Sequence, residues 1–135
     1  MTYFLAKTEP NTYSIEAFEK EKTTVWNGVR NAQALQAIKK MRLKDREFIY
    51  HSGGASAVVG LAEVVSKPTP DPDDVHSWVV GLRFLHSYIQ PYTTLADIKH
   101  SGLFGSFALV RQSRLSTMEV PDSFVQWLKG RGLKV

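Results

Sequence analysis

The stretch Trp26-Asn27-Gly28-Val29-Arg30-Asn31 decides how this chain is interpreted. Within a few residues it holds an aromatic ring, a glycine that permits a tight turn, a guanidinium and a carboxamide. The ring offers a surface for stacking, and the polar groups offer donors and an acceptor for the edges of a flat ligand. The segment therefore indicates a protein that grips a flat polar ligand, and it favours a binding protein over an enzyme.

The composition narrows the class of protein. At 135 residues the chain is long enough to bury a hydrophobic core, and we expect one domain. The absence of cysteine excludes a disulfide framework, thiolate metal sites and a cysteine nucleophile. No apolar run approaches a membrane span, and the first residues do not resemble a signal peptide. We therefore expect a cytoplasmic protein without a membrane partner.

The charge of the chain is +4, and the cations are unevenly distributed. Lysines and arginines crowd residues 30–46 and the C-terminal quarter, whereas Asp71, Asp73 and Asp74 form the one acidic loop. A basic half of this kind suits a polyanion, which would bind with strong salt dependence. A mildly basic surface with no such partner is the alternative that charge leaves open.

Hydrophobic periodicity predicts short strands interrupted by short helices. Strands are expected at residues 3–7, 23–26, 45–52, 58–65, 78–85 and 115–120, and helices after the caps Ser14, Asn31 and Thr94 and after Pro121. The proline-rich segment 68–74 is expected to be an exposed loop. Antiparallel pairs of strands joined as in hairpins, together with the short helices, predict an α+β fold. We expect a small, partly open β-barrel with flanking short helices. Such barrels offer a pocket at the mouth or the seam.

The position of Trp26 before a glycine turn predicts that its ring lies at a strand end beside a cavity. A tryptophan buried in the core is the alternative. Val29-Arg30-Asn31 at the start of a helix would place backbone N–H groups, a guanidinium and an amide together, as a polar rim for an anionic or heteroaromatic ligand. Asn31 is also a suitable helix cap, and the two roles are compatible.

Two strand ends supply further candidates. Lys7 and Glu9 alternate along the first predicted strand, so they would share a face and bind a base edge or act as general acid and base. An edge salt bridge is the commoner role of such a pair. Tyr50-His51-Ser52 ends another strand, where His51 either titrates near neutrality or is a hydrogen-bonded structural residue.

Signatures of hydrolytic and metal chemistry are missing. There is no Gly-x-Ser-x-Gly motif, the four histidines show no spacing for zinc, and no glycine-rich phosphate loop is present. We therefore expect no catalytic residue, no metal and no cofactor.

Several motifs, in the right order along almost the whole chain, resemble the EVE domain of the PUA-like superfamily, which also includes YTH and ASCH domains. The resemblance rests on Tyr3-Phe4-Leu5-Ala6-Lys7-Thr8-Glu9-Pro10, Trp26-Asn27-Gly28-Val29-Arg30-Asn31, Phe48-Ile49-Tyr50-His51-Ser52, Val59-Gly60-Leu61-Ala62-Glu63-Val64 and Arg111-Gln112-Ser113-Arg114-Leu115-Ser116. The last motif resembles that of bacterial, single-domain members. Asn27 stands where the family usually has aspartate, and Leu35 where relatives often have arginine.

The resemblance implies a PUA-like barrel that binds nucleic acid with a modified base inserted in a pocket, by analogy with YTH domains, which cage a methylated adenine. Trp26 falls where the YTH motif supplies a cage aromatic. Under this hypothesis Arg30, Arg111 and Arg114 contact phosphates or form the rim of the pocket, and the remaining residues of the set given next line the pocket. The expected ligand-binding residues are Lys7, Glu9, Trp26, Val29, Arg30, Asn31, Tyr50, His51, Ser52, Arg111, Ser113 and Arg114.

The favoured hypothesis is thus a non-enzymatic, monomeric reader of modified bases, in DNA rather than RNA, with biological output supplied by a separate effector protein. One alternative is an enzyme, since some ASCH relatives resemble amide hydrolases of modified nucleosides that use Lys, Thr and Glu. Lys7, Thr8 and Glu9 offer these residue types, although neighbours on a strand alternate faces. The other alternative is an RNA-binding accessory domain.

Overall fold

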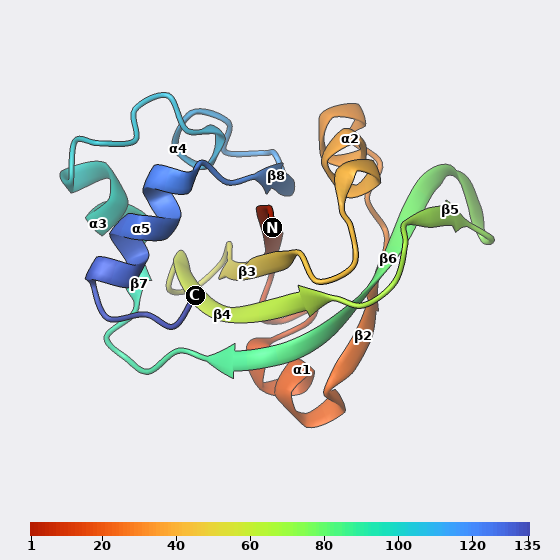
Figure 1. The fold of residues 1–135 in the computed structure, drawn as a ribbon, viewed down its shortest axis with the longest axis horizontal. Coiled ribbons are helices and arrows are strands. Elements are labelled where there is room, and N and C mark those ends of the chain that lie inside the picture. Colours follow the sequence, from red (N-terminus) through yellow and green to blue (C-terminus); the bar gives the residue numbers. More distant parts are fainter.

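A curled, partly open sheet forms the centre of the molecule, and short helices pack on it (Figure 1). The computed structural model describes residues 1–135. The strand order along the main path is β2-β6-β4-β3-β1-β8, with β5 paired to β6 and β7 paired to β4. The strands are β1 (Tyr3–Thr8), β2 (Thr23–Trp26), β3 (Arg46–His51), β4 (Ala57–Val64), β5 (Thr69–Asp71), β6 (Asp74–Ser87), β7 (Thr93–Thr94) and β8 (Thr117–Glu119).

Five helices connect or flank the strands, and three of them begin at the caps that the sequence predicts. The helices are α1 (Ile15–Glu21), α2 (Ala32–Lys40), α3 (Leu95–His100), α4 (Ala108–Arg111) and α5 (Asp122–Gly130). Ser14 Oγ accepts the N–H of Ala17 at 3.1 Å, and Thr94 forms a capping box with Asp97. These side chains satisfy N–H groups that the first helical turn leaves without partners. The predicted α+β class is confirmed.

The pairing of β1 differs from the expected antiparallel pattern. β1 lies parallel to β3, with Lys7 opposite Tyr50 and Thr8 opposite His51, and antiparallel to β8, with Ala6 opposite Thr117. Parallel neighbours cannot be joined by a tight turn and need a long crossover. Here the crossover contains α1, β2 and α2, so the expectation of hairpin returns alone is wrong for this pair.

The proline-rich segment is another difference from the sequence prediction. Part of it forms β5, which pairs with β6 so that Pro70 lies opposite Trp78. Proline is tolerated on an edge strand because its missing N–H faces away from the partner. β6 accordingly begins at Asp74 instead of Trp78 and runs through 14 residues. β7 and α4 were not predicted from the sequence, because they are too short to give a periodic signal.

The buried apolar side chains form one continuous core, to which both faces of the curled sheet contribute. On one face α1 and α2 bury Ile15, Phe18 and Ile38. A Cβ at Gly60 would collide with the side chain of Ile15 and a carbonyl of β6, so the close approach of α1 to β4 requires glycine at this position. On the other face the ring of Phe48 meets that of Phe124 of α5 edge to face, with centroids 6.3 Å apart.

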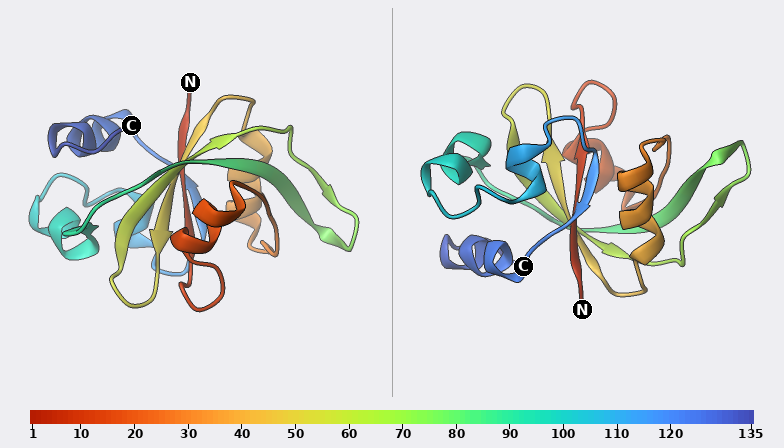
Figure 2. Two further views of the ribbon diagram at one scale, coloured as in Figure 1. Left: turned by 90° about the horizontal axis from the view of Figure 1, so that it is seen from below. Right: turned by 90° about the horizontal axis from the view of Figure 1, so that it is seen from above.

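Several distant segments end on the same side of the molecule. Figure 2 shows the turn after β1, the β3–β4 hairpin, the start of α2 and the loop before β8 at the end opposite the N-terminus. These segments hold most of the residues that the sequence analysis selected as ligand-binding. The fold therefore gathers motifs that are spread over a hundred residues of sequence.

Glu47 is an unusual feature of the core. Its side chain is fully buried on β3, opposite Phe4 of β1 and Ala62 of β4, and neither carboxyl oxygen has a hydrogen-bond partner. Burial disfavours the charged form and raises the pKa of Glu47 from its ordinary value of 4.5 to about 8. The folded protein therefore holds a proton on Glu47 at pH values where the unfolded chain has lost it.

Because the folded-state pKa of Glu47 lies above the unfolded one, we expect the free energy of unfolding to fall as pH rises from about 4.5 to about 8. The loss should be on the order of a few kcal/mol. Glu47→Gln should remove most of this slope and be more stable than the wild type at pH 8.5. Urea unfolding at several pH values tests this, with the exposed Glu19→Gln as control. An unchanged slope in Glu47→Gln would contradict the assignment.

Candidate functional site

The Trp26–Asn31 segment follows β2 and is held against β6. Gly28 has φ +76°, a left-handed conformation that side chains rarely adopt, and this permits the turn that the sequence predicts. Val29 is buried, and its carbonyl accepts a hydrogen bond from the Ser77 hydroxyl at 2.6 Å. Val29 thus anchors the segment, with its side chain in the core.

Trp26 lies at the edge of a cavity, as its position before the glycine turn predicts. The side chain is half-buried and lines a hollow of about 390 Å³ between the end of β1, α1 and β2. Within this hollow the Tyr13 hydroxyl donates a hydrogen bond to Glu21 Oε1 at 2.5 Å, and Thr8 Oγ1 donates to the Tyr13 carbonyl at 3.0 Å. The remaining lining residues are Thr12, Thr24, Val25 and Asn27.

The lining of this cavity is polar but carries no cation. Hydroxyl groups, an amide and one carboxylate surround the indole, and no lysine or arginine is among the lining residues. A phosphate would meet the Glu21 carboxylate without a compensating positive charge, which is unfavourable. The cavity therefore suits a neutral flat group that presents hydrogen-bond donors, not an anion.

Lys7, Tyr50 and Ser113 come together beside this cavity on the other face of β1. Lys7 Nζ donates a hydrogen bond to the Ser113 carbonyl at 3.0 Å and lies 5.9 Å from the centre of the Tyr50 ring. Burial lowers the pKa of Lys7 and raises the pKa of Tyr50. The contact ties the loop before β8 to β1, so three of the predicted site residues form one cluster.

Glu9 does not join Lys7 on a shared strand face. β1 ends at Thr8, and Glu9 begins a turn in which its carbonyl accepts the N–H groups of Thr12 and Tyr13 at 2.9 Å each. The alternation of faces holds only inside a strand, and Pro10 lacks the N–H that would continue the pairing. Glu9 is exposed and forms no ion pair with Lys7, so the edge salt bridge expected for that pair is absent.

His51 is a structural residue in this fold. Its Nε2 accepts the N–H of Ile15 at 3.1 Å, which satisfies the first turn of α1 and requires the proton to be on Nδ1. Burial lowers the pKa of His51, and the Glu16 carboxylate partly opposes this effect. The neighbouring Ser52 is exposed, and its backbone N–H donates to the Thr8 carbonyl at 3.0 Å.

The arginines of the predicted site lie on the surface around these clusters. Arg30 is 77% exposed and forms an ion pair with Asp74 at 2.9 Å. The pKa of Asp74 is held below its usual range first by the backbone N–H of His76 and then by Arg30. Asn31 caps α2, because its Oδ1 accepts the N–H of Ala34 at 3.1 Å. Arg111 and Arg114 are exposed on either side of Ser113.

Sequence reasoning missed several residues that line the Trp26 cavity: Thr8, Thr12, Tyr13, Glu21, Thr24, Val25 and Asn27. One signal was available for Thr24, since alternate residues of β2 share a face with Trp26. Tyr13 and Glu21 had no such signal, because α1 brings them to β2 through the tertiary fold.

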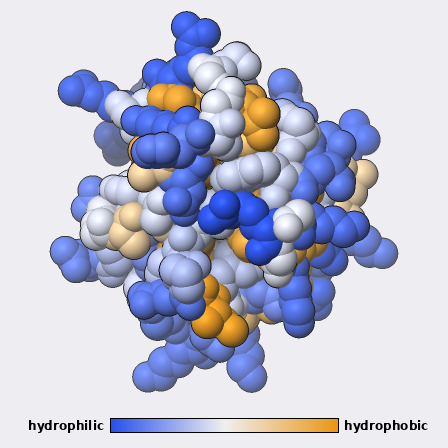
Figure 3. Space-filling model, turned by 90° about the vertical axis from the view of Figure 1, so that its left-hand side faces the viewer, coloured by the Kyte–Doolittle hydropathy of each residue, from blue (hydrophilic) through white to orange (hydrophobic).

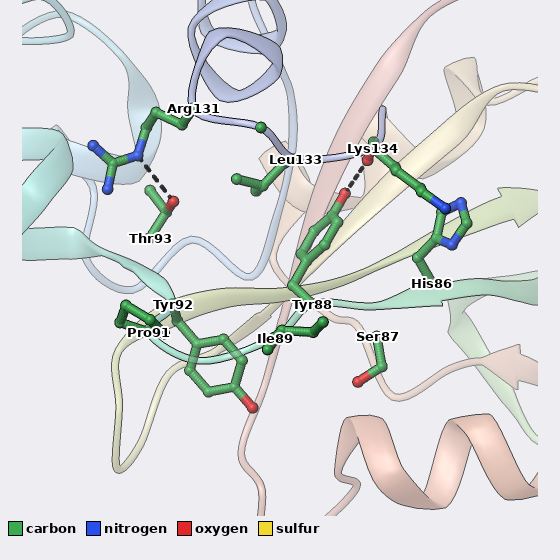
Figure 4. A pocket seen from close by; sticks show the side chains of 11 residues that line it. His86, Ser87, Tyr88, Ile89, Pro91, Tyr92, Thr93, Arg131, Leu133 and Lys134 are labelled. Carbon is green, nitrogen blue, oxygen red and sulfur yellow. Dashed lines mark hydrogen bonds between the residues drawn. The ribbon is translucent and has the colours of Figure 1, made fainter.

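A second cavity, of about 340 Å³, lies between the end of β6 and the segment after α5 (Figure 4). Its polar groups are largely used within the chain. The Tyr88 hydroxyl donates to the Lys134 carbonyl at 2.5 Å, and Arg131 Nε donates to Thr93 Oγ1 at 3.1 Å. None of the residues predicted from sequence lines this cavity. Figure 3 shows that this end of the molecule is mostly hydrophilic, with small and separate apolar patches.

The model for the EVE domain matches residues 2–130. The chain belongs to the EVE domain family. Thymocyte nuclear protein 1 of Rattus norvegicus is 37% identical over 81 residues, which cover 51% of this chain and 36% of that protein. The chain therefore spans about a third of the length of the curated relatives it matches.

Solved structures agree with the family. An NMR structure of a protein from Rhodopseudomonas palustris superposes with a TM-score of 0.89 at 30% identity, covering 100% of this chain and 97% of that one. Human THYN1 in complex with 5-methylcytosine containing DNA superposes with a TM-score of 0.87 at 22% identity, covering 100% and 99% of the two chains. The PUA-like fold implied by the resemblance is confirmed.

The structure contains neither a membrane-spanning helix nor a metal-binding cluster. No helix is of sufficient length and apolarity to span a bilayer. No group of three or more histidine, aspartate or glutamate side chains is placed to hold a metal ion.

The hydrogen bond from Ile15 to His51 predicts that the imidazole stabilises the start of α1. We expect His51→Ala to lower the free energy of unfolding by about 1 kcal/mol or more, the usual cost of losing a helix cap. His76→Ala is the matched control, because this side chain is exposed on β6. Thermal unfolding of both variants tests the assignment, and equal stability of the two would contradict it.

Proposed function

We propose that this chain is a non-enzymatic module that binds DNA carrying a modified base, with the base inserted into the Trp26 cavity. The observation that carries the proposal is the tryptophan-lined, cation-free cavity in a member of the EVE family. The human relative of the same fold has been solved with 5-methylcytosine containing DNA, which makes 5-methylcytosine the first ligand to test.

The energetics are compatible with base insertion. Removing a base from the stack costs a few kcal/mol, and least where the base is weakly paired. Stacking on one aromatic ring returns about 1–3 kcal/mol. The Glu21 carboxylate can accept from an exocyclic amine, the kind of contact by which acidic side chains recognise cytosine. One oxygen of Glu21 already accepts from Tyr13, which leaves the other for a base.

The arrangement of charge fits phosphates around the cavity instead of in it. Arg114 is exposed on the loop that Lys7 ties to β1, Arg111 is exposed at the end of α4, and Arg30 is exposed beside Asp74. Cations in such positions would fix the orientation of the DNA backbone, whereas the base pocket would supply selectivity. The Arg30 side chain is 77% exposed, and an ion pair at the surface contributes little stability, so a phosphate can compete for this guanidinium.

Geometry favours binding over hydrolysis. Lys7 points to the Ser113 carbonyl, Thr8 donates to the Tyr13 carbonyl, and Glu9 lies beyond the strand. These three side chains do not converge on one point, which the Lys, Thr and Glu chemistry of the alternative hydrolase would require. Comparing the affinity for RNA and DNA oligonucleotides of one sequence separates an RNA-binding role from the proposal. A separate effector protein would supply the biological output.

Trp26→Ala should abolish discrimination between 5-methylcytosine and cytosine in otherwise identical DNA, because the stacking surface is lost. We expect the wild type to prefer the modified DNA by about tenfold, a difference near 1.4 kcal/mol. Fluorescence anisotropy at physiological salt measures both affinities. Trp26→Phe should keep part of the preference, and Trp78→Ala is the control at another half-buried tryptophan. A full preference in Trp26→Ala would refute the assignment.

Arg114→Ala should lower the affinity for modified and for unmodified DNA by the same factor. The slope of log affinity against log salt should decrease by about 1, because one phosphate contact is lost. Lys99→Ala removes an exposed cation of α3 and should leave the slope unchanged. The salt series uses the same anisotropy measurement, and an effect of Arg114→Ala on modified DNA alone would place this arginine at the base instead.

A further inference from the structure

A polar groove lies between α2 and β8, outside the Trp26 cavity. It has a volume of about 290 Å³, near the lower end of ligand pockets. Gln33, Gln36 and Lys40 line it from α2, at helical spacings of three and four residues, so they share one face of the helix. Thr117 and Glu119 line it from β8, where alternate residues share a face.

Several polar groups of this groove have no partner within the chain. The carboxamides of Gln33 and Gln36 are exposed and form no intramolecular hydrogen bond. Lys40 and Glu119 form no ion pair. The Thr117 hydroxyl is fully buried and also has no partner, which is rare for a buried polar group. The exposed side chains among them are free to bond to a ligand, whereas the Thr117 hydroxyl is enclosed in the fold.

One end of the groove lies beside two residues of the predicted ligand-binding set, Asn31 and Ser113, which do not themselves line the Trp26 cavity. Gln33 follows the α2 cap Asn31 by two residues, and Leu115 follows Ser113 by two residues, so one end of the groove lies within about 7 Å of both. Figure 2 shows α2 running beside β8 from the end that carries the site toward the N-terminus. The nine residues of α2 span about 13 Å, room for about four stacked nucleotides of one strand.

The charges indicate which part of a nucleic acid would occupy the groove. Lys40 and Glu119 give the groove one charge of each sign and so no net positive charge for a phosphate, whereas carboxamides form paired hydrogen bonds with base edges, above all with adenine. The exposed Arg111 and Arg114 are not among the lining residues of the groove; Arg111 ends α4, and Arg114 lies on the loop that precedes β8. A base thus fits the floor of the groove and its phosphates fit the rim.

We propose that the α2–β8 groove binds the bases that flank the inserted modified base, and that Gln33 and Gln36 make binding dependent on sequence context. This inference rests on the proposed function, since it places a second subsite on the same DNA strand. Under this proposal α2 contributes to the sequence specificity of DNA binding as well as packing on the sheet.

The test uses DNA of one length with a single 5-methylcytosine and all sixteen combinations of the bases on its two sides, each with an unmodified counterpart. The wild type should show a spread of at least fivefold among contexts. In the double variant Gln33→Ala and Gln36→Ala the spread should shrink to within twofold, while the ratio between modified and unmodified DNA is kept. Alanine is a strong helix former, so α2 remains intact. Gln126→Ala on the exposed side of α5 is the matched control.

The possible failures can be told apart. An equal context spread in the double variant and the wild type, or no spread in the wild type, would overturn the groove proposal while the methyl preference still stands. A context spread that depends on the two glutamines without any methyl preference would support the groove and reject the Trp26 cavity as a base reader. Absence of DNA binding in any context would reject both proposals.

Discussion

The parallel pairing of β1 with β3 is the contact on which the candidate site depends. Lys7 lies opposite Tyr50 and Thr8 opposite His51, so two motifs forty residues apart end side by side. Because parallel strands need a crossover connection, residues 9–45 must leave the sheet edge and return. That crossover contains α1, β2, the Trp26–Asn31 segment and α2. The Trp26 cavity forms where the start of the crossover, with Thr8 and Tyr13, meets the end of β2.

The loop before β8, near the C-terminal end of the chain, is bonded to β1 and so lies beside the candidate site. The backbone N–H of Lys7 donates to the Ser116 carbonyl at 2.7 Å, and its ammonium group donates to the Ser113 carbonyl. These bonds hold the arginine-bearing loop next to the cavity, and β8 next to α2. A neutral cavity, a cationic rim and a carboxamide-lined groove therefore follow from one strand and its two neighbours. This separation of base and phosphate contacts is what selective binding of nucleic acid requires.

Much of the fold could be predicted from the sequence, for identifiable reasons. The caps Ser14, Asn31 and Thr94 fixed helix starts, alternation of residues located β3, and a nearly continuous apolar run located β4. The turn at Gly28 was also predicted correctly, and Trp26 lines a surface hollow at the end of β2. The parallel pairing of β1 was not, since local periodicity carries no information on which strands pair. β5 was missed because prolines marked a loop where an edge strand forms.

The candidate site was harder to predict because side-chain roles depend on tertiary neighbours. His51 caps α1 across 36 residues of sequence, and Tyr13 and Glu21 reach Trp26 only through the packing of α1. Glu9 was expected on the strand but falls in the turn that Pro10 imposes. Val29 and Asn31 proved to have structural contacts, with Ser77 and the first turn of α2. The binding roles of the remaining residues are therefore the part of the account that needs experiment.

The most direct measurement is an NMR titration that follows the three indole N–H signals, assigned with single tryptophan variants. Trp26, Trp78 and Trp127 each contribute one signal. With DNA carrying 5-methylcytosine, the Trp26 signal should shift strongly upfield through ring stacking, while those of Trp78 and Trp127 stay near their free positions. Unmodified DNA should shift it much less. A complex in which modified DNA binds selectively while the Trp26 signal does not move would contradict the account.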